Sequence, residues 1–214
     1  MRLGIMGGTF DPIHHGHLFV AEEARVRFRL NNVLFVPNGT PPHKKEYALT
    51  PARHRYAMTL IATHGNQSFG CSPMELNRPG PSYTVETLTL LREQHPDAEL
   101  FYITGVDAIA DILTWMRHEE VIQMATFIAA TRPGFDPRTL KEKLPLSYLE
   151  RILLLGSTSL GISSTEIRER IRQSLPVRYL TPDNVLEYIF QNGLYQSTPS
   201  QDPIAVSGAT IREK

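Results

Sequence analysis

A glycine-rich stretch between a predicted strand and a predicted helix constrains the fold of this chain most. Residues 2–6 form a short apolar run that predicts a buried strand, and the apolar residues of 18–28 recur with the spacing of one buried helix face. Between them, residues 7–17 read Gly-Gly-Thr-Phe-Asp-Pro-Ile-His-His-Gly-His. A strand, a glycine loop and a helix at the start of a chain predict an α/β fold, in which ligands bind beyond the carboxyl ends of parallel strands.

The chemistry of this stretch points to a bound phosphate. Gly7 and Gly8 carry no Cβ, so a bulky ligand can come close to the backbone. His14 and His17 are three residues apart at the start of the helix, where free backbone N–H groups also favour an anion. Two imidazoles there can donate hydrogen bonds to phosphate and stabilise charge in a transition state. One alternative is a turn with surface histidines. Another is a pair of metal-binding histidines, but no third ligand follows at a spacing typical of a metal site.

This stretch resembles the signature of the nucleotidylyltransferase superfamily, whose core is His-x-Gly-His, and its full form is similar to that of bacterial nicotinate-nucleotide adenylyltransferases. The resemblance covers residues 1–195. It implies one α/β domain with a Rossmann-like, doubly wound, mostly parallel sheet flanked by helices. It also implies that Gly8, Thr9 and Phe10 contact both substrates. The ATP contacts implied in this stretch are Gly7, Gly8, Thr9, Phe10, His14 and His17.

A basic segment follows the strand expected over residues 33–36. Residues 37–45 read Pro-Asn-Gly-Thr-Pro-Pro-His-Lys-Lys, and their prolines exclude a continued strand. The basic triplet could be a solvated loop tip, but its place after a strand, in a chain with one phosphate site already, favours ligand contact. Similar adenylyltransferases carry Pro-Pro-His-Lys here, which implies that His43 and Lys44 contact phosphates. Asn38 is expected to contact the mononucleotide.

The middle of the chain contains residues that the family uses for the pyridine ring. A Pro-Ser-Tyr-Thr loop resembles the one that cradles nicotinate, which implies contacts from Ser82, Tyr83 and Thr84. Ser82 or Thr84 could instead cap the helix expected over residues 85–93. Trp115 belongs to a Thr-Trp pair from which the family stacks an aromatic ring on the pyridine. The structural alternative is a tryptophan of the core.

Three further residues are implied to lie near the nucleotide. A strand expected over residues 100–103 leads into Thr-Gly-Val-Asp, whose acidic side chain could bind ribose hydroxyls or cap the next helix. The family's Gly-x-Asp segment matches Gly105 and Asp107. Its Arg-Pro-Gly turn matches Arg132, two positions after the end of a strand expected over residues 126–130.

The second strong signal is Ile-Ser-Ser-Thr-Glu-Ile-Arg-Glu-Arg at residues 162–170. Ser163 and Glu166 form a capping box, so a helix begins here, and its first turn offers hydroxyls and free N–H groups to phosphate. Arg168 can reach the same anion with its planar donors, unless it is only a surface arginine on a well-capped helix. The segment resembles the Ser-Ser-Thr-x-Ile-Arg element that closes the ATP site in the superfamily. The contacts it implies are Ile162, Ser163, Ser164, Thr165 and Arg168.

The other elements are predicted from apolar runs and capping residues. Thr50 and Pro51 are expected to begin a helix that Gly65 ends, with residues 53–55 on a solvated face. The remaining predictions are strands at 69–71 and 152–155, a helix at 119–124, a polar surface helix within 136–150 and a final helix between 181 and 193.

Composition limits the class of protein. The 214 residues suffice for one domain, and 22 basic residues balance 22 acidic ones, which argues against a nucleic-acid partner bound through phosphates. The single Cys71 fits a reducing compartment, and no apolar run approaches the roughly 20 residues of a membrane span. We expect a cytoplasmic protein without a signal peptide. The oligomeric state stays open, a homo-oligomer included.

These features favour direct transfer of a nucleotidyl group. The sequence has no Gly-x-x-x-x-Gly-Lys-Ser/Thr, no Gly-x-Gly-x-x-Gly after the first strand and no Gly-x-Ser-x-Gly. We hypothesise that the phosphate of a mononucleotide attacks the α-phosphorus of ATP and that His14 and His17 stabilise the transition state. Lys44, Arg168 and a Mg²⁺ ion held by the ATP phosphates, without protein ligands, would neutralise the triphosphate.

Resemblance, not composition, makes nicotinate mononucleotide the preferred acceptor. Nicotinamide mononucleotide and phosphopantetheine stay open as alternative acceptors. A cytidylyltransferase and a non-catalytic nucleotide sensor stay open as alternative functions. Residues 196–214 lie outside the resemblance and are expected to form a polar, flexible tail. Its last eight residues imitate residues 163–170, so a decoy arm that occupies an active site is the alternative.

Overall fold

The computed structural model describes the chain except for residues 42–48, 132–133, 157–159 and 197–214. The strands are β1 (Arg2–Gly8), β2 (Asn32–Pro37), β3 (Phe69–Cys71), β4 (Glu99–Gly105), β5 (Thr126–Ala130) and β6 (Ile152–Leu155). The helices are α1 (His15–Arg27), α2 (Ala52–Thr63), α3 (Thr84–Gln94), α4 (Val106–Ala110), the short 3-10 helix η1 (Ile112–Thr114), α5 (His118–Met124), α6 (Arg138–Lys143), α7 (Leu146–Leu149), α8 (Ser164–Arg172) and α9 (Asp183–Gln191).

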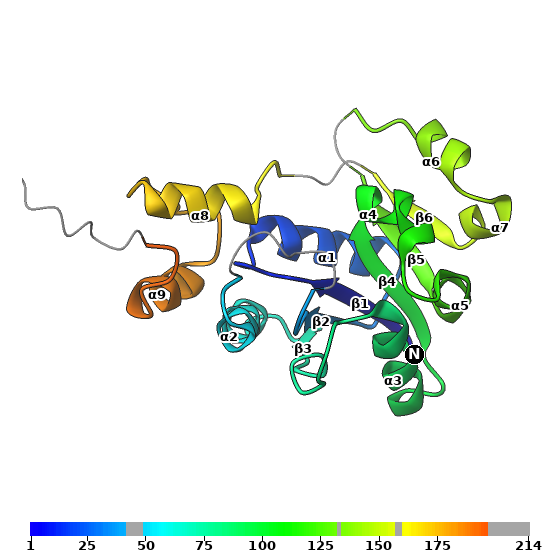
Figure 1. Cartoon of the computed structure of the whole chain (residues 1–214), viewed down its shortest axis with the longest axis horizontal. Coiled ribbons are helices and arrows are strands. Elements are labelled where there is room, and N and C mark those ends of the chain that lie inside the picture. The colour runs from blue at the N-terminus through cyan, green and yellow to red at the C-terminus, as the bar shows by residue number, and fades with distance from the viewer. Residues whose placement is uncertain (42–48, 132–133, 157–159, 197–214) are drawn as a thin grey trace, which may run out of the picture.

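The six strands form one parallel sheet in the order β3-β2-β1-β4-β5-β6. β1 lies in the middle, where Met6 pairs with Phe35 of β2 and with Ile103 of β4. The chain first winds outward from β1 to β3 and then outward from β4 to β6 (Figure 1). This order confirms the predicted doubly wound fold, and its switch point lies between the carboxyl ends of β1 and β4, where such sheets bind ligands.

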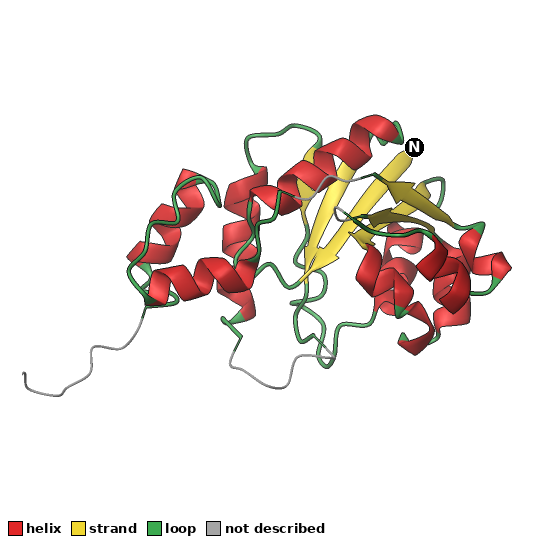
Figure 2. Cartoon of the chain, turned by 90° about the horizontal axis from the view of Figure 1, so that it is seen from above, coloured by secondary structure: helices red, strands yellow, loops and turns green. Residues whose placement is uncertain are grey.

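Two apolar cores cover the two faces of the sheet. Along β4, Leu100 and Tyr102 belong to one buried cluster, and Phe101 and Ile103 belong to the other. Successive side chains of a strand point to opposite faces, so the two clusters lie on opposite sides. The first is covered by α3 to α7 and the second by α1, α2, α8 and α9. Figure 2 shows the sheet between these groups of helices.

No helix within the described ranges is both long and apolar enough to cross a membrane.

Helix α2 differs from the expectation at its start and on one face. It begins at Ala52 with Pro51 as N-cap, and the Thr50 N–H donates to a carboxylate oxygen of Asp11 at 3.4 Å. The prediction of a solvated face was wrong for Arg55, which is 1% exposed. Its guanidinium donates to three loop carbonyls, and such long-range contacts leave no trace in the spacing of residues along a helix.

Two other local predictions need correction. Neither Ser82 nor Thr84 caps α3: its N-cap is Tyr83, which makes no side-chain capping bond. The Ser82 hydroxyl is engaged elsewhere, because it accepts the N–H of Gly39 at 3.0 Å. Residues 136–150 form two short helices in place of one, and they bury Leu140 against the first core cluster.

Candidate active site

The two histidines of the first motif stack at the entrance to α1. His14 is the N-cap, and its ring lies 3.7 Å from that of His17 between centroids, with 25° between the planes. The backbone N–H of His14 donates to Nδ1 of His17 at 3.3 Å. Because Nδ1 accepts, the proton of the neutral His17 ring lies on Nε2. His17 can therefore present an Nε2–H donor to a phosphate oxygen.

His14 is buried and uncharged. Burial, and to a smaller extent the charge of neighbouring His15, lowers the pKa of His14 from 6.5 to about 4. Its Nδ1 is buried without a hydrogen-bond partner in the described part of the chain. A buried polar atom without a partner costs free energy, so this nitrogen suits a ligand that completes its hydrogen bonding.

The glycines of this motif are required by the chain itself. A Cβ at Gly7 would collide with the hydroxyl of Tyr102, and a Cβ at Gly8 would lie 2.9 Å from the ring of Phe10. Phe10 is 2% exposed, and its ring meets His17 edge to face at 5.1 Å. The buried Phe10 side chain therefore packs against His17. A ligand contact of Phe10, as predicted, would have to come from its backbone.

Successive carbonyls of the first loop receive hydrogen bonds from the far end of the chain. Asp11 O accepts from Arg168 at 2.7 Å, and Pro12 O accepts from the Ser164 hydroxyl at 2.8 Å. Tyr195 donates to a carboxylate oxygen of Asp11 at 2.6 Å. Arg168 and Ser164 belong to α8, whose N-cap Ser163 accepts the N–H of Glu166 as predicted. The two strongest sequence motifs thus meet at one edge of the sheet.

A first pocket of about 640 Å³ lies between these motifs. Six residues predicted for ATP line it: His14, His17, Gly105, Ile162, Ser163 and Ser164. The carboxyl ends of β4 and β5 contribute Thr104 and Ala130 to its floor. Imidazole donors and the N-terminal turn of α8 therefore face the same space, which suits a phosphate chain.

A second pocket of about 690 Å³ adjoins the first. Seven predicted residues line it: Gly7, Thr9, Asn38, Ser82, Tyr83, Thr84 and Trp115. Trp115 is half-buried and meets Tyr102 and Phe127 edge to face at 6.1 and 6.3 Å, so it belongs both to the core boundary and to the pocket. Thr104 lines both pockets, which places their junction beside β1 and β4.

Some predicted residues lie apart from these two pockets. Thr165 and Arg168 line a neighbouring cavity of about 500 Å³ together with Tyr195. Asp107 is exposed in the first turn of α4, two residues beyond Gly105 of the first pocket. Gly8 and Phe10 line neither pocket. Three predicted contacts, His43, Lys44 and Arg132, lie outside the described residues.

Sequence reasoning missed several residues that line the pockets. Thr104 is the clearest, and its position directly before Gly105 at the end of a buried strand could have indicated it. Tyr102 also lines the second pocket, and burial raises the pKa of its hydroxyl to about 12, so it is a neutral donor. Met116 and Arg117 border the same pocket after Trp115. No periodicity marks them, because they follow a short 3-10 helix.

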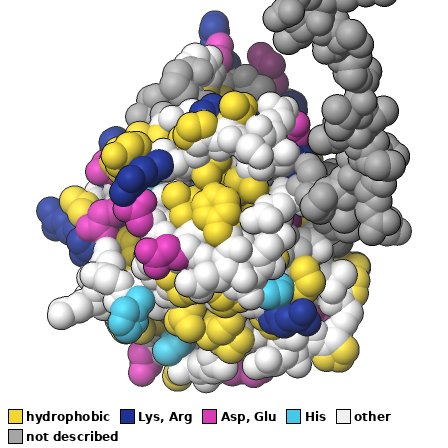
Figure 3. All heavy atoms as spheres, turned by 90° about the vertical axis from the view of Figure 1, so that its left-hand side faces the viewer, with side chains coloured by type: hydrophobic (Ala, Val, Ile, Leu, Met, Phe, Trp, Pro, Cys, Tyr) yellow, Lys and Arg dark blue, Asp and Glu magenta, His cyan; other side chains and the backbone are white. Residues whose placement is uncertain are grey.

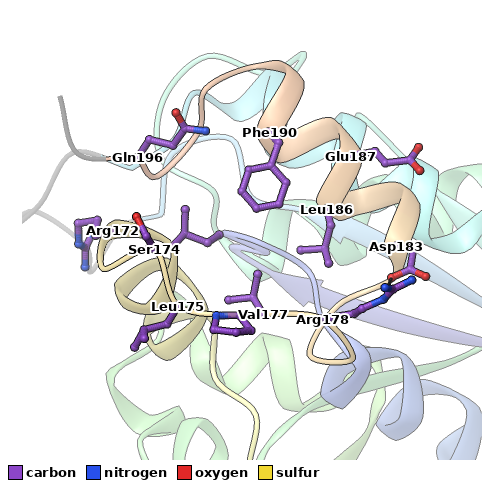
Figure 4. Close-up of a pocket in the computed structure, with 12 residues that line it drawn as sticks. Arg172, Ser174, Leu175, Val177, Arg178, Asp183, Leu186, Glu187, Phe190 and Gln196 are labelled. Atoms are coloured by element: carbon purple, nitrogen blue, oxygen red, sulfur yellow. Dashed lines mark ion pairs between the residues drawn. The ribbon is translucent and has the colours of Figure 1, made fainter. Parts of the chain in front are cut away.

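A larger pocket lies away from the predicted residues, at the end of the molecule formed by α8 and α9. It has a volume of about 760 Å³, and Figure 3 shows apolar side chains gathered on this face. In Figure 4, Leu186 and Phe190 point from α9 into the space above Val177. Half of the residues that line it are apolar and half are polar, with Arg172, Ser174 and Arg178 among the polar ones, and none of the predicted site residues is among them.

Within the described ranges, no group of three or more His, Cys, Asp or Glu side chains could hold a metal ion.

Known proteins with related sequences cover nearly the whole chain. The family model of cytidylyltransferase-like proteins matches residues 5–170. A protein of Moorella thermoacetica, named probable nicotinate-nucleotide adenylyltransferase, is 50% identical over 199 residues, which cover 91% of this chain and 92% of that protein. One of the same name from Acidothermus cellulolyticus is 48% identical over 202 residues, with 92% and 95% covered.

A solved structure shares the fold. The nicotinic acid mononucleotide adenylyltransferase of Plasmodium falciparum, complexed with NaAD, matches with a TM-score of 0.71 at 21% identity. The match covers 91% of this chain and 97% of that one. The chain therefore belongs to the cytidylyltransferase-like family and, within it, to the nicotinate-nucleotide adenylyltransferases.

Proposed function

We propose that this chain transfers the adenylyl group of ATP to nicotinate mononucleotide, giving nicotinate adenine dinucleotide and pyrophosphate. The observation that carries the proposal is the pair of pockets that meet at Thr104, beside the carboxyl ends of β1 and β4. One pocket is lined by the stacked histidines and the other by Trp115. Relatives that are 46–50% identical carry the name of this activity.

Each pocket suits one substrate. The first offers imidazole donors and the N-terminal turn of α8, so we assign ATP to it. The second offers the flat ring of Trp115 for stacking and the N-terminal turn of α3, with Tyr83 and Thr84, for a carboxylate. This assignment places the mononucleotide phosphate and the ATP α-phosphorus on either side of Thr104.

The reaction needs alignment more than a strong base. An oxygen of the mononucleotide phosphate forms a bond to the α-phosphorus, the bond from that phosphorus to the β-phosphate oxygen breaks, and pyrophosphate leaves with the electron pair. A phosphate monoester is already ionised at neutral pH, so its repulsion from ATP is the main obstacle. We assign to His17 Nε2–H and the neutral His14 the donation of hydrogen bonds to the α-phosphoryl oxygens.

Cationic groups complete the assignment. We assign to Arg168 a role through the first loop, and the hydrogen bond that its guanidinium donates to the Asp11 carbonyl supports this assignment. Lys44 is proposed as the cation that neutralises the phosphates from the loop after β2. A Mg²⁺ ion bound to the ATP phosphates would supply further charge neutralisation for the leaving pyrophosphate. We place the reaction in the cytoplasm, since the single Cys71 suits a reducing compartment.

A pyrophosphate-release assay tests the function. Purified chain with ATP and Mg²⁺ is offered nicotinate mononucleotide, nicotinamide mononucleotide or phosphopantetheine, and the product is identified by chromatography. We expect release with nicotinate mononucleotide to exceed that with either other acceptor at least 10-fold, and CTP not to replace ATP. Faster turnover of nicotinamide mononucleotide would overturn the assignment of nicotinate mononucleotide as the acceptor. No pyrophosphate release with any acceptor would favour a nucleotide sensor.

A further inference from the structure

Arg55 joins three loop segments, and two of them, at residues 9 and 38–39, border the second pocket. Its side chain is 1% exposed, whereas Arg53, two positions earlier on α2, is exposed. Nε donates to the carbonyl of Thr50 at 2.9 Å. The two terminal nitrogens donate to the carbonyls of Thr9 at 2.8 Å and Gly39 at 2.9 Å. One guanidinium thus holds the ends of segments that are far apart in the sequence.

The surroundings of Arg55 compensate its buried charge. Burial lowers its pKa, while the nearby side chains of Asp11, Tyr195 and Glu75 act in the opposite direction. Asp11 is 3% exposed and Glu75 is 4% exposed, so both carboxylates are as buried as the guanidinium that they face. A planar group with donors in fixed directions dictates where its acceptors lie. A lysine, with a compact ammonium, cannot reproduce that pattern.

The loop after β2 is held from its other side as well. The Gly39 N–H donates to the Ser82 hydroxyl at 3.0 Å, and the Asn38 amide donates to a carboxylate oxygen of Glu75 at 2.9 Å. Gly39 also has no room for a side chain, because a Cβ there would collide with the carbonyl of Glu75. Asn38 and Gly39 are therefore held between Arg55 on one side and the segment before α3 on the other.

We propose that Arg55 is a positioning residue for the mononucleotide, an inference that rests on the proposed function. Of its acceptors, Thr9 lines the second pocket, and Gly39 directly follows Asn38, which also lines it. None of the three acceptors is among the described residues that line the first pocket. Loss of the guanidinium fork therefore loosens the mononucleotide pocket more than the ATP pocket.

The test measures binding of each substrate separately, with Arg55→Lys in the full chain. Calorimetry gives the dissociation constants of nicotinate mononucleotide and of ATP. We expect the first to rise about 10-fold, as for the loss of one to two well-formed hydrogen bonds, and the second to change less than about threefold. The matched control is Arg53→Lys, an exposed arginine on the same helix, which should leave both constants unchanged.

A merely structural role predicts a different pattern. It would lower the melting temperature of Arg55→Lys and either weaken the binding of both substrates equally or leave both dissociation constants unchanged. Each of these two binding results overturns the proposal. Should the lysine variant not fold, Arg55→Gln, measured at a temperature at which it is folded, must show the same asymmetry, although it leaves the buried Asp11 and Glu75 carboxylates without the guanidinium charge and costs more stability. If the unmodified chain does not bind nicotinate mononucleotide, the proposed function fails and the inference falls with it. If that chain binds and the variants show no asymmetry, the inference alone fails.

Discussion

At the scale of single residues, the proposed mechanism assigns the most specific role to His17. Its Nδ1 is occupied by the His14 N–H, so only Nε2 can serve the transition state. Replacing His17 by Ala should lower kcat by on the order of 10²-fold or more, the effect of removing one transition-state donor. Steady-state kinetics with ATP and nicotinate mononucleotide measure the effect.

The neighbouring His15 provides the control for that substitution. It lies in the same helical turn but lines neither of the two pockets. His15→Ala should keep kcat within about threefold of the unmodified chain, as expected for a side chain that makes no transition-state contact. A His17→Ala variant with near-normal turnover would remove the histidine from the mechanism.

His14 makes the stability of the fold depend on pH. The pKa of its ring is lowered to about 4, whereas a histidine in an unfolded chain titrates near about 6.5. Between these values the unfolded chain binds a proton that the folded chain does not, so the free energy of unfolding falls as the pH falls from 6.5 to 4. The loss reaches about 3 kcal/mol at most. Above pH 6.5 this contribution is constant.

Urea unfolding at pH 7 and pH 4.5 checks this effect. His14→Asn should lose less stability than the unmodified chain between the two pH values, because it has no buried imidazole to charge. His64→Asn is the matched control, since His64 is exposed and its replacement should leave the loss unchanged. An equal loss of unfolding free energy in all three proteins would show that groups other than His14 cause the loss of stability at acid pH.

At the scale of elements, the sequence predicted what depends on local periodicity and capping. The strand at residues 33–36 is apolar throughout because it is covered on both faces, and the helix at 164–172 begins where its capping box predicts. Contacts between elements were not predictable in this way. Arg55 was expected in solvent, since no local pattern shows that three carbonyls of distant loops converge on it.

The same limit applies to the pockets. Ser82 and Thr84 were placed beside the ligand by resemblance, and the structure puts both on the second pocket, but the bond between Ser82 and Gly39 joins two loops that are 43 residues apart. Likewise, α8 was expected near the first motif, whereas the direct bond from Ser164 to Pro12 required the complete fold. Motifs indicate which residues gather, and tertiary contacts decide which of them line the pockets.

At the scale of the whole molecule, the described domain closes on itself near residue 195. The Tyr195 hydroxyl donates to a carboxylate oxygen of Asp11, inside the first motif, and burial raises the pKa of that hydroxyl so that it stays protonated. Within the described residues, this contact ties the end of the predicted domain to the first motif. We propose on this basis that residues 1–195 form the catalytic unit and that residues 196–214 contribute nothing to turnover.

Two truncations test this division. A chain that ends at Tyr195 should keep kcat and both KM values within about twofold, and a change in KM for either substrate would instead favour the decoy arm. A chain that ends at Leu194 also loses Tyr195 and its hydrogen bond to a charged group, which contributes about 1.5–3 kcal/mol. For a domain of this size, its melting temperature should fall by roughly 3–12 °C. Equal melting temperatures for the two truncated chains would mean that the Tyr195–Asp11 contact does not stabilise the domain.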